Sequence, residues 1–143
     1  MAFRFRLQTS LRLAEQEVDI VRALLAQEIS RLRDMTDKRD NQERIFKQAL
    51  AGQTSACITE PHNLHLWQAY TGEQKEILKV LEVQIEEQKI RVEEKRQLLV
   101  EHRIKAEKYI RLKEKQAKHY KLEELRKEQS LIDEIAQNHK GSS

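Results

Sequence analysis

Residues that break helices or form turns are scarce in this 143-residue chain, which has three glycines, one proline and seven aromatic residues. A βαβ or barrel domain of this length needs a turn roughly every ten residues, and so few glycines and prolines cannot supply them. Apolar residues make up only 38% of the chain, which is too little for a thick core. These shortages exclude most enzyme architectures.

The chain also lacks a disulfide, a membrane span and a strong excess of one charge. Its single cysteine, Cys57, permits no internal disulfide, and 27 Lys+Arg against 24 Asp+Glu give a net charge of +3. That near balance is unlike the surface of a nucleic-acid coat. No apolar run is long enough to cross a bilayer, and charges from Arg12 onward interrupt any signal-peptide core. We therefore expect a soluble intracellular protein that binds no nucleic acid and contacts a membrane peripherally at most.

What the chain has in abundance is Glu, Lys, Arg, Leu, Gln and Ala, a composition typical of long helices. Its helix breakers cluster between Gly52 and Pro61. A glycine favours a helix end, and a proline favours a helix start. The sequence therefore predicts a single coiled-coil domain over residues 1–143, with one helix over about 3–51, a loop over 52–61 and a second helix over about 62–138.

Both predicted helices carry apolar residues at heptad spacing. In the first helix, ten of thirteen seam positions are apolar. In the second, one row is mostly apolar and its companion row has four polar residues among seven. A repeat of about 3.5 residues buries such a stripe when two helices supercoil. We therefore expect an all-α fold of two long helices in an antiparallel coiled-coil hairpin, with the second helix overhanging at the C-terminus. The first seam comprises Leu7, Leu11, Ala14, Val18, Val21, Leu25, Glu28, Leu32, Met35, Arg39, Gln42, Phe46 and Ala49, and the second rows run from Leu64 to Ala106 and from Trp67 to Tyr109.

Catalysis and metal binding find little support. His62 and His65 follow Cys57, but a zinc site needs a fourth ligand. The glycines form no phosphate-binding loop, and glutamate pairs such as Glu86 and Glu87 fit solvated helix faces with ion-pair partners. We therefore expect no catalytic, cofactor-binding or metal-binding residue, no cofactor and no enzymatic activity.

Three surface features leave alternatives open. Residues 103–121 carry eight Lys or Arg against two Glu, which fits either a cationic shaft that meets an anionic partner or a merely soluble helix face. Apolar side chains near the loop either fasten it to the helices or form a recognition patch; these are Phe46, Ile58, Trp67 and Tyr70. A third row lies away from the seam and is either scattered or a second docking face; it comprises Val83, Ile90 and Ile104.

The layout of the chain resembles the flagellar export protein family FliJ. The features that carry this resemblance are the opening Phe3-Arg4-Phe5-Arg6-Leu7-Gln8-Thr9-Ser10-Leu11, a first helix of about fifty residues, and Trp67-Gln68-Ala69-Tyr70 before a longer charged helix. The resemblance implies an antiparallel coiled coil similar to the central shaft of rotary ATPases. It also implies a place at the cytoplasmic face of the cell membrane, beneath the flagellar basal body.

The same resemblance implies partners and site residues. The end with both termini would enter the hexameric export ATPase FliI, which has the regulator FliH, and would promote its assembly and turnover. The opposite part would contact the export-gate protein FlhA, and substrate chaperones would also bind. By position, the implied gate-binding residues are Phe46, Trp67, Tyr70, Gln74 and Ile77. The implied ring-binding residues are Leu7, Leu11, Lys113, Lys115, Lys118 and Lys121. The alternatives are a self-associating structural coiled coil, the stalk of a virulence secretion system, and a nucleic-acid-binding helix pair.

Overall fold

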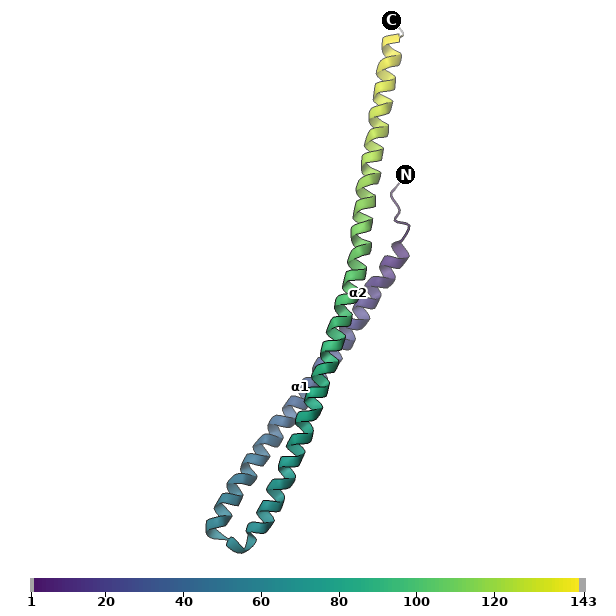
Figure 1. Ribbon diagram of the computed structural model, residues 1–143. Helices are drawn as coiled ribbons and strands as arrows, with labels where there is room; N and C mark the ends of the chain where they lie inside the picture. The colour runs from purple at the N-terminus through teal and green to yellow at the C-terminus, as the bar shows by residue number, and fades with distance from the viewer. Residues whose placement is uncertain (1, 142–143) are drawn as a thin grey trace. The chain divides into compact units, whose positions relative to one another are not determined.

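The computed structural model describes residues 2–141, which form two helices joined by a tight turn (Figure 1). Helix α1 spans Gln8–Thr59, the 3-10 turn η1 spans Pro61–Asn63, and helix α2 spans Leu64–Gly141. No strand occurs among the described residues. The two helices pack against each other, so the predicted all-α helical hairpin is confirmed.

The predicted loop over 52–61 is wrong, because α1 continues through it to Thr59. The hydroxyl of Thr59 donates a hydrogen bond of 2.9 Å to the carbonyl oxygen of Ser55 within α1. Pro61 sets the end of the helix, because the residue before a proline is driven out of the helical region. Glu60 accordingly has φ −140° and ψ 65°. The connection is therefore much shorter than predicted.

Contacts divide the chain into two compact units. Unit 1 combines the residues up to Ile20 with those from Val100 onward, and unit 2 is Val21–Leu99 and contains the turn. The expected single domain over residues 1–143 stays a prediction, and Met1, Ser142 and Ser143 lie outside the described residues. Each unit has its own buried core, and each unit carries its own exposed surface.

Heptad positions make up these cores, as the sequence predicts. All thirteen seam positions of α1 and all fourteen positions of the two α2 rows are buried or half-buried. Burial of aliphatic side chains in this way is the main stabilising contribution to a helix pair. The buried apolar residues of unit 1 are Phe5, Leu11, Ala14, Val18 and Ala106, and those of unit 2 are Val21, Ala49, Ala56, Ile85, Val92 and Leu99.

The predicted helix start at residue 3 is also wrong, because α1 begins at Gln8. The preceding segment places two aromatic rings in unit 1: Phe5 is buried, and the ring of Phe3 lies 5.7 Å from that of Tyr120. At the other end, α2 runs from Leu64 to Gly141, a small shift from the expected 62–138.

Candidate functional site

Four polar side chains in the heptad rows of unit 2 form two pairs across the two helices. The amide Nε2 of Gln42 donates to Oε1 of Gln74 at 2.7 Å and to the Gln74 carbonyl oxygen at 3.1 Å. Fourteen residues back along α1 and fourteen forward along α2, Nε2 of Gln88 donates to Glu28. Equal and opposite steps are what an antiparallel heptad repeat requires. The two polar layers therefore belong to one register.

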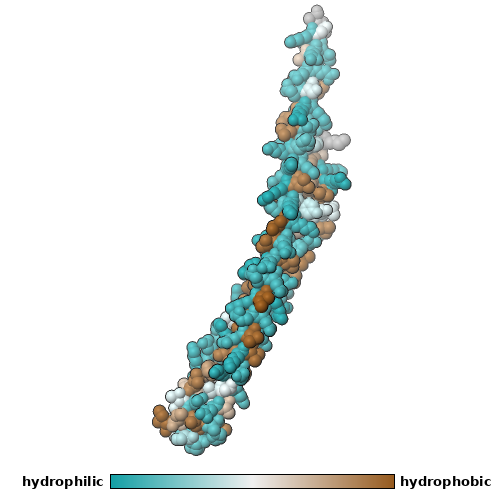
Figure 2. All heavy atoms as spheres, in the orientation of Figure 1, coloured by the Kyte–Doolittle hydropathy of each residue, from teal (hydrophilic) through white to brown (hydrophobic). Residues whose placement is uncertain are grey.

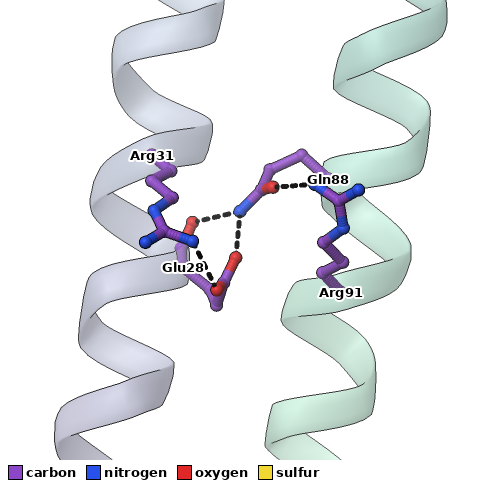
Figure 3. Close-up of polar contacts among 4 residues, drawn as sticks. All are labelled: Glu28, Arg31, Gln88 and Arg91. Atoms are coloured by element: carbon purple, nitrogen blue, oxygen red, sulfur yellow. Dashed lines mark hydrogen bonds and ion pairs between the residues drawn. The ribbon is translucent and has the colours of Figure 1, made fainter.

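The Glu28–Gln88 layer is the most buried of these contacts (Figure 3). Gln88 is 0% exposed, and its Nε2 lies 2.9 Å from the Glu28 carbonyl oxygen and 2.5 Å from Oε2 of Glu28. Arg31 forms an ion pair with the same carboxylate at 3.0 Å, and Arg91 donates to Oε1 of Gln88 at 3.4 Å. A buried carboxylate and amide are tolerated because each has a hydrogen-bond partner.

Near the turn, the ring of Trp67 packs directly onto Gly52. A Cβ added to Gly52 would lie 2.5 Å from Cη2 and 2.9 Å from Cε3 of Trp67, and closer still to Cζ3. None of the described glycines has a positive φ, so Gly52 does not end the helix as the sequence predicts. It allows the close approach of a large ring to the backbone of α1. Trp67 also meets Tyr70 edge to face, with ring centroids 6.3 Å apart.

We expect Gly52→Ala to disturb the packing of Trp67 and Gly72→Ala to stabilise the helix. A methyl group at Gly52 displaces the ring of Trp67, the only tryptophan, so its fluorescence emission shifts to longer wavelength. A methyl group at Gly72 meets nothing within 4 Å, so helix propensity raises the free energy of unfolding by about 0.5–1 kcal/mol with unchanged emission. Emission spectra and thermal melts check both results. Unchanged emission in Gly52→Ala would contradict the close packing.

An apolar ridge lies exposed on α2 beside the turn, and it consists of Leu66, Tyr70, Ile77 and Val80. Their spacing of four, seven and three residues places them along one side of the helix. They are 43–59% exposed. Leu66 and Tyr70 also line a shallow depression of about 490 Å³ together with Asn63 and Trp67. Figure 2 shows hydrophobic side chains at the surface beside the turn.

The structure divides the five predicted gate-binding residues into two groups. Tyr70 and Ile77 are exposed and belong to the ridge. Phe46, Trp67 and Gln74 occupy heptad rows and are half-buried between the helices, where Gln74 bonds to Gln42. Phe46 and Gln74 are therefore poorly placed to touch a partner, whereas Trp67 also lines the depression beside Tyr70. Sequence reasoning missed two further exposed residues of the ridge, Leu66 and Val80.

The six predicted ring-binding residues are divided in the same way in unit 1. Leu11 is 4% exposed, and Leu7 is half-buried. Lys113 continues a heptad row of α2 and is half-buried as well. The other three are exposed on α2, and these are Lys115, Lys118 and Lys121. Only the lysines of this second group offer their charge fully to solvent.

The exposed lysines extend a longer basic stripe on α2, which consists of Lys108, Arg111, Lys115, Lys118 and Lys121. Each member lies three or four residues from the next, so neighbours share a helix face, and all five are exposed. Arg111 pairs with Glu107 at 3.4 Å, whereas the four lysines have no ion-pair partner among residues 2–141. Unpaired charges of one sign attract an anionic surface. The stripe is therefore the strongest candidate in unit 1 for contact with an acidic partner.

A match to a known protein family covers nearly the whole chain. The family model described as "Flagellar FliJ protein" matches residues 3–140. This chain belongs to the FliJ family. The resemblance seen in the sequence is thus confirmed. No curated protein and no solved structure matches the chain.

Membership of the FliJ family makes the chain a component of the flagellar export apparatus, which transports protein, and not a member of an enzyme family. Within the described residues, neither helix has a segment long and apolar enough to cross a membrane. Among residues 2–141, no three His, Cys, Asp or Glu side chains gather as metal ligands.

Proposed function

We propose that this protein is a non-enzymatic coupling component of flagellar export. It stimulates and assembles the export ATPase ring, and it links that ring to the export gate and to substrate chaperones at the cytoplasmic face of the membrane. The observation that carries the proposal is the presence of two exposed surfaces of different chemistry in different units of a FliJ-family chain. One is the basic stripe of unit 1, and the other is the apolar ridge of unit 2.

The basic stripe is the proposed contact with the ATPase ring and its regulator. Four of its lysines are exposed and unpaired within the described chain, so they keep their attraction for a carboxylate-lined surface. Contacts between exposed charges are individually weak, which suits a contact that forms and breaks repeatedly. Leu7 and Leu11 support this surface indirectly, because they pack inside unit 1.

The apolar ridge is the proposed contact with the gate protein FlhA. Tyr70 is its aromatic anchor, and its edge-to-face contact with Trp67 limits the freedom that it loses on binding. Ile77, Leu66 and Val80 extend the same face with aliphatic groups that gain stability when a partner removes them from water. Trp67 supports Tyr70 through this ring contact, and its own ring packs close to α1 at Gly52.

Stimulation of ATP hydrolysis tests the ring contact. We expect the wild-type protein to raise the turnover of the cognate export ATPase, and Lys115→Glu/Lys118→Glu/Lys121→Glu to lose most of that effect. A matched triple variant that reverses three exposed lysines of unit 2 changes the net charge equally and should retain it; these are Lys47, Lys75 and Lys89. No stimulation by a saturating amount of wild-type protein, or equal stimulation by both triple variants, would refute the contact.

A further inference from the structure

The last part of α2 carries a heptad seam that nothing in unit 1 covers. Every residue from 125 to 141 is exposed. Leu122, Leu125 and Ile132 are 47%, 56% and 59% exposed, whereas the seam positions of both helices up to Tyr109 are all buried or half-buried. This segment thus keeps the pattern of a coiled coil without the partner helix that such a pattern serves.

The spacing defines which face a partner would cover. Successive seam residues are three, four, three and four positions apart, and they are Leu122, Leu125, Gln129, Ile132 and Ala136. This is the alternation of a two-helix seam. Ile135 lies beside the same face and adds apolar surface, since it is 59% exposed. The occupant therefore has to be a helix, and the charges that flank the seam restrict its identity and direction.

Pairing of this segment with a parallel copy of itself is opposed by charge. In a parallel pair, the residues just before Leu122 and Gln129 flank the seam. Each of them faces the residue five positions further along the other helix. Lys121 would then face Arg126 of the second copy, and Glu128 would face Asp133 of the second copy. Both contacts bring like charges together on each side of the pair.

An antiparallel copy reverses this result. When Leu125 lies opposite Ala136 of the second copy and Gln129 opposite its Ile132, Arg126 comes to face Asp133. Because the arrangement is symmetric, this attraction occurs twice. The paired segments 125–136 also lie wholly within the exposed part of α2.

We propose that the seam from Leu125 to Ala136 binds the same segment of a second copy of this chain, antiparallel, to form a reversible dimer. The contact is short and contains Gln129 at a central position, which weakens an apolar seam. The pair is therefore expected to form at high protein concentration and to separate on dilution. It begins about one helical turn after Lys121, the last residue of the basic stripe.

Charge exchange tests the pairing in solution. By analytical ultracentrifugation, the full chain is expected to show a monomer–dimer equilibrium, and Arg126→Asp or Asp133→Arg to raise its dissociation constant about tenfold. The exchange Arg126→Asp/Asp133→Arg should restore the wild-type value. Lys127→Asp is the matched control, because residue 127 lies on the side of α2 away from the seam. Both substitutions remove an ion pair within α2: Lys127 pairs with Glu124 at 3.7 Å, and Arg126 pairs with Glu123 at 3.1 Å.

Cysteine crosslinking tests the direction. In a Cys57→Ser background, we expect a mixture of Gln129→Cys and Ile132→Cys chains to form the disulfide between the two variants rather than within either one. A wild-type chain that stays monomeric at every concentration would overturn the proposal. So would an exchange variant that fails to dimerise, or a dominant Gln129→Cys homodimer, which would report parallel pairing. The ATPase measurement depends on substitutions at Lys115, Lys118 and Lys121 and not on those used here, so either proposal can fail while the other holds.

Discussion

Gln88→Ala is expected to lower the free energy of unfolding by about 2–4 kcal/mol, as much as truncation of a buried aliphatic side chain. Gln88 is 0% exposed, and the side chain of Glu28 is only 12% exposed. Removal of the amide leaves the carboxylate without the donor that faces it from α2 and leaves a cavity between the helices. Denaturant unfolding followed by circular dichroism at 222 nm measures the change.

Two further variants make this prediction specific. Gln84→Ala is the matched control, because Gln84 is exposed on the same helix and its substitution changes helix propensity by the same amount. Glu28→Leu/Gln88→Leu is expected to be at least as stable as the wild-type protein, because an apolar pair avoids the cost of burying a charge. If Gln88→Ala were as stable as Gln84→Ala, the Glu28–Gln88 layer would not have the stabilising role assigned to it.

Tyr70→Ala/Ile77→Ala is expected to weaken binding of the FlhA cytoplasmic domain about 100-fold with unchanged helicity. Both residues are more than 40% exposed on one face of α2. Their removal therefore changes the free energy of unfolding of the unbound protein only slightly. An aromatic anchor and a neighbouring aliphatic group together contribute a few kcal/mol to a typical interface. Isothermal titration calorimetry with the isolated gate domain measures the dissociation constant.

Ile90→Ala is the control for the gate contact. Ile90 is 59% exposed on α2 of the same unit but lies on a different row from Ile77. We expect this variant to bind the gate domain with less than a twofold change. A similar loss of affinity in Ile90→Ala would extend the contact to the row with Val83, and unchanged affinity in the Tyr70/Ile77 variant would exclude the ridge.

Much of the hairpin could be predicted because heptad spacing is a direct consequence of helix geometry. A helix that packs along one partner needs apolar residues at alternating steps of three and four. The seam from Leu7 to Ala49 has this spacing, and all of its positions are buried or half-buried. The turn could not be placed in the same way. Gly52 favours a helix end and Pro61 a helix start, and the sequence does not say that a tryptophan fifteen residues after Gly52 occupies the space beside it.

The candidate site was only partly predictable for a related reason. Aromatic character marks Phe46, Trp67 and Tyr70 equally as interface residues, but only the heptad row decides which of them faces a partner. Trp67 and Gln74 belong to a heptad row that faces α1, whereas Tyr70 lies outside that row and is exposed. Applying the seam to every residue near the turn would have separated them and would have found Leu66 and Val80.

The polar seam positions show what pattern alone leaves out. Gln42, Gln74, Glu28 and Gln88 weaken the heptad signal when each helix is considered by itself. They become favourable only as pairs, since each amide meets its acceptor across the helices. A pairing of this kind depends on register, which is fixed by contacts between residues 32 and 60 positions apart in the chain.

The most direct test of the coupling role is whether one copy of this protein holds the ATPase and the gate domain at the same time. Sedimentation of the three components together is expected to give a ternary complex. Tyr70→Ala/Ile77→Ala should lose only the gate domain, and Lys115→Glu/Lys118→Glu/Lys121→Glu should lose only the ATPase. If the ATPase and the gate domain instead displaced each other from the wild-type protein, the proposal that two separate surfaces link them would be contradicted.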